Sequence, residues 1–150
     1  MISNKCKYAI RALQYIALQK EENRSIMSSE IAEKNSIPKK FLESILHTLK
    51  TNKLLSSKRG SSGGYKLLKD PSEITLTEVI RIIDGPIALL PCVSLNYYQS
   101  CDGCDEQCCT IKGVFEAIRD QTLEVLSNTT IASMNEKWNE LNAINDLKNV

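Results

Sequence analysis

Residues 37–67, which read IPKKFLESILHTLKTNKLLSSKRGSSGGYKL, decide the fold. Apolar residues recur at helical spacing through the first half of this segment. Pro38 suits the first turn of that helix, where its missing N–H would have no intrahelical partner. The stripe expected to face inward comprises Phe41, Leu42, Ile45, Leu46 and Leu49. The first half of the segment therefore predicts an amphipathic helix.

The glycine-rich second half predicts a two-stranded hairpin. One strand begins at Leu54 and Leu55, the other covers residues 65–68, and the glycines between them permit a turn. Lys58 and Arg59 fall at its tip, where an arginine can enter a DNA minor groove. The glycines are not followed by the Lys-Ser/Thr of a phosphate-binding loop, so we do not predict a nucleotide site.

The chain before this segment supplies two more helices. Residues 4–20 are amphipathic and can be capped by Ser3 or Asn4. Ser28 can cap a short second helix that ends at residues 35–36. Two helices separated by so short a turn form a helix-turn-helix, whose second helix can enter a DNA major groove.

The chain after the hairpin predicts three further helices. A capping box at residues 75–78 opens one of them, and Gly85 followed by proline ends it. Residues 110–127 form a long helix whose bulky apolar residues have no evident intramolecular partner, which suggests dimerisation. A short terminal helix follows around residues 131–141, and the tail at 142–150 is expected to fray.

Five of the six cysteines lie in residues 92–109, CVSLNYYQSCDGCDEQCC. Two residues separate Cys101 from Cys104, a spacing that lets both thiolates reach one metal site from a single turn. Cys109 precedes a helix N-terminus, whose dipole lowers the pKa of a thiol. An iron–sulfur cluster, tetrahedral zinc and a metal-free thiol–disulfide switch all suit this pattern. Cys6 stands apart on the first helix and is expected to fill the core.

Charge is divided along the chain although the net charge is only +1. Residues 34–69 carry nine lysines and arginines against one acid, Glu43, whereas residues 102–150 carry four bases and nine acids. A basic half beside an acidic half suggests a polyanion-binding module joined to another part. No signal peptide and no apolar run of about 18 residues is evident, so we expect a cytoplasmic protein.

The order of these parts resembles the Rrf2 family of bacterial winged-helix regulators, whose members include iron–sulfur cluster regulators and nitric-oxide-sensing repressors. The resemblance runs from about residue 2 to residue 135. It is strongest in KYAIRALQYIA at residues 7–17 and in residues 37–67. The RG-x-x-GGY of the hairpin, residues 59–65, and the Gly-Pro after the fourth helix are typical of the family.

The resemblance implies a homodimer that binds a palindromic operator in double-stranded DNA, with the long helix at 110–127 as the dimer interface. It implies that the groove-reading face comprises Lys39, Lys40, Phe41, Glu43 and Ser44. Arg59, beside Lys58, takes the minor-groove role of the wing. Glu43 either pairs with a neighbouring base or accepts a hydrogen bond from a cytosine amino group. We expect His47 to be a helix-face or core residue rather than a ligand.

The resemblance also implies that the cysteines before the long helix bind a cluster, with the last ligand directly before that helix. The predicted metal ligands are Cys92, Cys101, Cys104 and Cys109, with Cys108 in reserve. Lys112 stands where a family histidine would be expected. Four thiolates accommodate either a [2Fe–2S] or a [4Fe–4S] cluster, and we favour [2Fe–2S]. Asp102, Asp105 and Glu106 are expected to be solvated loop charges.

The sequence therefore predicts a mainly α fold with a small β-hairpin wing. Its parts are a winged helix-turn-helix DNA-binding domain at 1–85, a cluster-binding loop at 86–109, and a dimerisation helix with a C-terminal helix at 110–150. The predicted function is a transcriptional repressor, not an enzyme, whose cluster senses redox state, nitric oxide or iron–sulfur status. The alternatives are a small iron–sulfur electron carrier and a zinc-stabilised protein-interaction module.

Overall fold

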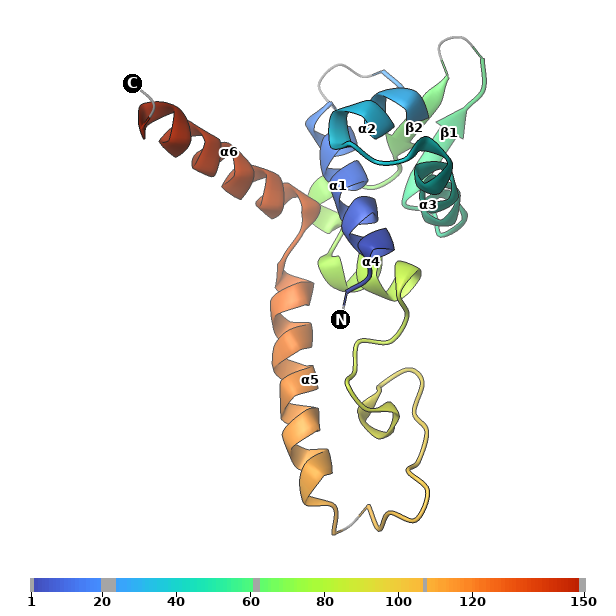
Figure 1. Cartoon of the computed structure of the whole chain (residues 1–150), viewed down its shortest axis with the longest axis vertical. Helices are drawn as coiled ribbons and strands as arrows, with labels where there is room; N and C mark the ends of the chain where they lie inside the picture. The colour runs from blue at the N-terminus through green and yellow to red at the C-terminus, as the bar shows by residue number, and fades with distance from the viewer. Residues whose placement is uncertain (1, 20–23, 61–62, 107, 149–150) are drawn as a thin grey trace.

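The computed structural model describes residues 2–19, 24–60, 63–106 and 108–148. Within these ranges six α-helices, two strands and two short 3-10 helices follow one another (Figure 1). In chain order they are α1 (Asn4–Leu18), α2 (Ser28–Asn35), α3 (Lys39–Thr51), β1 (Leu55–Lys58), β2 (Gly64–Leu67), η2 (Pro71–Glu73), α4 (Leu76–Ile83), η3 (Pro91–Val93), α5 (Thr110–Asn128) and α6 (Ile131–Lys148). The predicted fold class, mainly α with a β-hairpin wing, is confirmed.

The core lies where α1, α2, α3 and α4 meet. Four apolar side chains of α3 are completely buried there: Leu42, Ile45, Leu46 and Leu49. The prediction that Phe41 belongs to this buried stripe is wrong, since its side chain is 40% exposed. One residue corresponds to about 100° around a helix, which places Phe41 on the flank of α3 beside the stripe.

The turn between α2 and α3 forms the predicted helix-turn-helix. Ser36 adopts the left-handed conformation at the end of α2, with φ 52°. Ile37 is buried, and its N–H donates to the Ala32 carbonyl at 2.9 Å. Two boundaries differ from prediction: Ser28 is the first residue of α2 rather than its cap, and Pro38 is the N-cap of α3 rather than part of its first turn. Both helices pack against α1.

The wing is an antiparallel hairpin with Leu55 opposite Leu67 and Lys58 opposite Gly64. Ile26 joins its second strand through two backbone hydrogen bonds with Tyr65, of 3.0 and 2.8 Å. Ile26 is buried, so this bridge ties the wing to the segment that leads into α2. The orientation of the wing relative to the helix-turn-helix is therefore set by backbone contacts as well as by side-chain packing.

We expect Gly64→Ala to destabilise the protein by roughly 2–3 kcal/mol. Gly64 has φ +149°, and a Cβ at this position would lie 2.5 Å from the Ile26 carbonyl oxygen. The bridge to the wing would have to open to accommodate it. Urea denaturation measures the effect, with Gly113→Ala as the control, because a Cβ there meets nothing within 4 Å. Equal stability of the two variants would contradict this account of the wing.

α4 and α6 close the other side of the core. The Thr75 hydroxyl caps α4 by accepting the Glu78 N–H at 3.2 Å, while the Glu78 carboxylate pairs with Lys69 at 2.6 Å. Only half of the predicted capping box is therefore in place. Thr75 also bridges to Thr130 at the start of α6.

α6 is longer than the predicted short helix, because it continues to Lys148. Its first turns pack on α1. There Gln14 Nε2 donates to Asn135 Oδ1, and Asn135 Nδ2 donates to the Gln14 backbone carbonyl, each at 3.2 Å. Its distal part projects from the body of the protein (Figure 1). Polar contacts so distant in sequence leave no local pattern from which they could be predicted.

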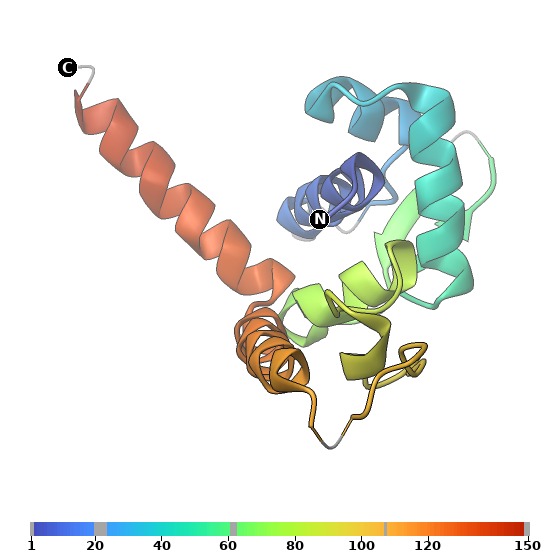
Figure 2. The ribbon, with the colours of Figure 1, turned by 60° about the horizontal axis from the view of Figure 1, so that its bottom comes forward.

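α5 extends away from the winged-helix part, and the segment between α4 and α5 runs beside it (Figures 1 and 2). The half-buried side of α5 contacts α4 and η3. Across the described ranges, no helix has the length and apolarity needed to cross a membrane. The cysteine segment thus forms the connection between the compact core and the extended helix.

Candidate nucleic-acid interface and metal centre

α3 presents a polar face to solvent. Lys40, Glu43, Ser44 and His47 are all exposed and lie within roughly a third of the helix circumference. Lys39 and Phe41 are also exposed, but they lie on opposite flanks of this face. The predicted groove-reading residues are thus all accessible, with three of them on the outward face itself.

His47 is not among the predicted DNA-contacting residues, yet it lies one turn beyond Glu43 and Ser44 on the outward face. Its place four residues after Glu43 is the signal from which this could have been inferred. The Ser44 hydroxyl donates to the Phe41 carbonyl at 2.8 Å, which leaves the hydroxyl oxygen free to accept. The outward face therefore offers a cation, a carboxylate, a hydroxyl and an imidazole over two turns.

The wing adds positive charge beside α3. Lys58 ends β1, Arg59 follows it, and both side chains are exposed. Gly60, with φ +112°, turns the chain directly after Arg59. α3 and the wing together contain most of the nine bases of residues 34–69, so the surface they share suits a polyanion.

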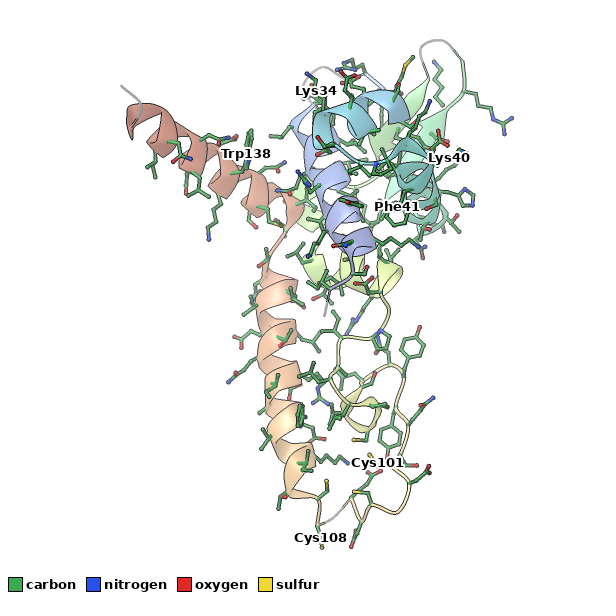
Figure 3. The ribbon with its side chains drawn as sticks, viewed as in Figure 1. Lys34, Lys40, Phe41, Cys101, Cys108 and Trp138 are labelled. Atoms are coloured by element: carbon green, nitrogen blue, oxygen red, sulfur yellow. The ribbon has the colours of Figure 1, made fainter. Side chains whose placement is uncertain are left out.

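The cysteine segment places the five thiols unequally. Cys92 is buried in η3, whereas Cys101, Cys104 and Cys108 are exposed and Cys109 is half-buried at the N-cap of α5. Cys108 lies at the tip of the segment, at the end of the molecule far from the winged-helix part (Figure 3). Cys6 is completely buried in α1, as expected for a core residue.

The thiols interact in two pairs that involve the four predicted ligands. The neighbouring Cys92 thiol is the largest cause of a raised pKa at Cys101. The neighbouring Cys109 thiol is likewise the largest cause of a raised pKa at Cys104. The charges of the other pair also raise the pKa of Cys101 and of Cys104. Cys108 belongs to neither pair.

The pKa of Cys109 is lowered, in the direction that its position before α5 predicts. The backbone N–H of Lys112 is the largest cause, followed by the Cys104 thiol, and the N–H of Ile111 adds to them. These N–H groups belong to the first turn of α5, where helix donors have no carbonyl partner. Cys109 is thus the thiol of its pair that ionises first.

A second group of side chains connects the cysteine segment to α5. The Glu106 carboxylate accepts from Lys112 Nζ at 2.7 Å and from the Tyr98 hydroxyl. These bonds lower the pKa of Glu106, with Lys112 as the largest cause. The expectation that Glu106 is a solvated loop charge is therefore wrong. Glu106 forms an ion pair with Lys112. Lys112 is the residue that stands where a family histidine would be expected.

η3 is anchored to α5 as well. Arg119 Nη1 donates to the Val93 carbonyl at 2.6 Å, and Arg119 Nε pairs with Asp120 at 2.8 Å. Val93 is buried beside Cys92. Arg119 therefore fixes the position of Cys92 relative to α5. This role has no sequence signal, because an arginine two turns into a helix is ordinarily a solvated residue.

The donor chemistry of the segment fits a thiophilic metal or an iron–sulfur cluster. Four thiols occur as two neighbouring pairs, one on η3 and the loop, the other on the loop and the N-cap of α5. Among the residues with described positions, however, no three Cys, His, Asp or Glu side chains are close enough together to hold a metal ion. The two pairs would have to approach each other to share one centre.

The outer side of α5 carries an exposed apolar stripe. Ile111, Val114, Ile118 and Val125 recur at intervals of three, four and seven residues. They are 39–65% exposed. Of the apolar residues expected on this helix, Phe115, Leu123 and Leu126 are half-buried, whereas Ile111, Val114 and Ile118 are exposed. Val125, which was not predicted, adds to the exposed stripe, and Ile118 also borders a pocket lined by Ile80 and Leu89. The spacing of the stripe is that of a helix that packs against another helix.

Comparison with known proteins agrees with this architecture. The Rrf2 family model, described as an iron-dependent transcriptional regulator, matches residues 2–137. A protein of Rhodobacter capsulatus named as an rrf2-like HTH-type transcriptional regulator is 42% identical over 137 residues, which cover 89% of this chain and 91% of the relative. The HTH-type transcriptional regulator IscR of Escherichia coli O1:K1 is 30% identical over 133 residues, 89% of this chain and 78% of the relative.

Solved structures with the same fold include CymR, the global cysteine regulator of B. subtilis. It superposes with a TM-score of 0.76 at 26% identity, covering 91% of this chain and 97% of that chain. IscR of T. potens superposes with a TM-score of 0.73 at 26% identity, covering 94% of this chain and 90% of that chain.

Proposed function

Because the chain belongs to the Rrf2 family of transcriptional regulators, we propose that it is a homodimeric repressor whose affinity for operator DNA depends on an iron–sulfur cluster. The proposed cluster ligands are Cys92, Cys101, Cys104 and Cys109. The observation that carries the proposal is the placement of these four cysteines in the segment that connects the winged-helix core to α5, from Cys92 in η3 to Cys109 at the N-cap of α5.

DNA binding rests on the outward face of α3 and on the wing. Lys40 contacts phosphate or a guanine edge, and Glu43 accepts from a cytosine amino group in the major groove. Arg59 enters the adjacent minor groove. A carboxylate surrounded by lysines and arginines discriminates against nucleobases that have no amino group to donate to it. Glu43 therefore supplies sequence preference, while the lysines supply affinity.

Dimerisation rests on the exposed stripe of α5. Packing two copies of this stripe together removes Ile111, Val114, Ile118 and Val125 from water. A dimer with two-fold symmetry presents two recognition helices to two half-sites of a palindrome. The distance between those helices then depends on how α5 is held relative to the core of each protomer.

The cysteine segment controls that relation. Cys92 is tied to α5 through Val93 and Arg119, and Cys109 is the first residue before α5. When bound, an iron–sulfur cluster would supply a link between the thiolates that is sensitive to oxidants and nitric oxide. With all four thiolates on one centre, the segment would hold α4 and α5 in one arrangement; without it, other arrangements become populated. A [2Fe–2S] cluster is our preferred form.

A second candidate function is a cluster-free thiol regulator. It is favoured by the arrangement of the thiols as two neighbouring pairs, with no three metal ligands together in the described part of the chain. The fold is shared with CymR, a global cysteine regulator, and with a CymR of Staphylococcus aureus solved in an oxidised form. Paired thiols of this kind could join as disulfides on oxidation.

Anaerobic native mass spectrometry distinguishes the two candidates. We expect a dimer that carries one cluster per chain, and the mass of the cluster gives its type. A dimer of bare chains whose mass falls by two hydrogens per disulfide after peroxide treatment would support the thiol regulator instead. A salt-dependent gel shift with DNA then tests the operator-binding half of the proposal independently of the cofactor.

We expect Arg59→Ala to weaken operator binding by roughly tenfold or more and to flatten its salt dependence. The variant removes a charge from each wing of the dimer without touching the core, because Arg59 is exposed. Titrations at several salt concentrations measure both effects. Lys137→Ala is the matched control, since Lys137 is an exposed base on α6, away from α3 and the wing. Equal losses in the two variants would remove the wing from the interface.

A further inference from the structure

Phe41 is an exposed aromatic ring on a basic surface. It occupies the first turn of α3, directly after Lys39 and Lys40, and its side chain is 40% exposed. The apolar packing of α3 is carried by four other residues that are completely buried. An aromatic ring of this size is not needed to seal the core when so much of it remains in contact with water.

The ring of Phe41 is held from one side by Tyr8 of α1. The ring centroids are 5.8 Å apart and the planes meet at 84°, an edge-to-face arrangement. Tyr8 itself is half-buried and packs against the hydrophobic core, so it is a fixed support. Figure 3 shows Phe41 between α3 and α1. The Phe41 side chain is thus oriented by a contact outside its own helix, while part of its surface stays exposed.

We propose that Tyr8 positions the Phe41 ring for contact with the C5-methyl group of a thymine in the operator. This inference rests on the proposed DNA-binding function and adds the base feature that is read. The thymine methyl is the apolar group that the major groove displays, and phenylalanine is one of the side chains that can contact it. The N-terminal residues of a recognition helix are those that reach base edges. Tyr8 is a positioning residue, because it acts through Phe41.

The same geometry separates this role from simple packing. The contact with a methyl requires the ring at a defined angle, so loss of Tyr8 should remove the response to the methyl while leaving the charges of α3 and the wing unchanged. Salt dependence of binding should therefore be the same with and without Tyr8. A packing role would lower stability and affinity for all DNA sequences together.

The test uses duplexes selected from a random-sequence library by the full-length wild-type protein. Each thymine of the half-sites is replaced in turn by deoxyuridine, which removes only the C5-methyl. At one position of each half-site, wild type should bind the uracil duplex about fourfold more weakly. Tyr8→Phe should keep this ratio, whereas Phe41→Ala and Tyr8→Leu should bring it close to one. Thermal unfolding of each variant checks that it is folded.

Each outcome decides the inference. A ratio near one at every thymine for wild type, or selected half-sites without thymine, would overturn it while leaving the proposed function intact. A ratio that persists in Tyr8→Leu would show that Tyr8 does not position the ring. Failure of the wild-type protein to enrich any sequence would instead overturn the proposed function, and this inference with it.

Discussion

Cys104→Ser is expected to abolish binding of an iron–sulfur cluster, whereas Cys108→Ser leaves the cluster in place. Both cysteines are exposed in the same segment, so the substitutions are closely matched in their surroundings. Cys104 is paired with Cys109 and feels the charges of Cys92 and Cys101, while Cys108 takes part in neither pair. A hydroxyl is a poor replacement for a thiolate ligand, so loss of one ligand of four should release the centre.

Iron, acid-labile sulfide and visible absorbance per chain after anaerobic purification measure this effect. Cys92→Ser, Cys101→Ser and Cys109→Ser should behave like Cys104→Ser. Cys6→Ser is a further control, because Cys6 is buried in α1 far from the segment in the chain. Retention of a full cluster by Cys109→Ser together with its loss in Cys108→Ser would exchange the two adjacent cysteines in the ligand set.

Ile118→Asp is expected to dissociate the homodimer. Ile118 lies in the middle of the exposed stripe of α5, and the two-fold axis would bring two carboxylates into the apolar contact. Burying unpaired charges costs several kcal/mol, which corresponds to a rise of roughly a thousandfold or more in the dimer Kd. Operator affinity should fall by about a hundredfold or more, because a monomer binds one half-site alone and loses the avidity that the dimer has from binding two half-sites at once.

Sedimentation velocity over a range of protein concentrations measures the first effect and a gel shift the second. Ile118→Leu is the control that keeps the stripe apolar and should remain dimeric. Since Ile118 is exposed in one protomer, the helix content of Ile118→Asp should not change. A dimer that survives this substitution would place the interface elsewhere than on the outer side of α5.

The elements that sequence patterns predicted best are those with strong local periodicity. The buried stripe of α3, the glycine-rich hairpin and the Thr75 cap all appear close to where the spacing placed them. The length of α6 was underestimated, because its distal turns have few apolar residues to mark them. The Ile26 bridge to the wing leaves no local pattern, since its partner Tyr65 lies 39 positions away.

In the candidate site, too, the features that depend on local sequence could be predicted, and those that depend on distant contacts could not. The position of Cys109 before a helix predicted the lowered pKa of its thiol, because the largest cause is a backbone N–H in the first turn of α5. The pairing of Cys101 with Cys92, the hold of Lys112 on Glu106 and the anchoring of Val93 by Arg119 depend on how the loop folds back along α5. Phe41 was assigned both to the core and to the DNA face, and only the contact with Tyr8 explains why it lies between them.

The most direct test of the central claim compares operator binding with and without the cluster. The Kd for one selected duplex is measured anaerobically, at fixed salt, for the cluster-loaded wild-type dimer and for a variant with all five cysteines of residues 92–109 replaced by serine. Both proteins are first shown to be dimeric. The account predicts that the two Kd values differ by roughly tenfold or more. Equal values would show that the cysteine segment does not control DNA binding.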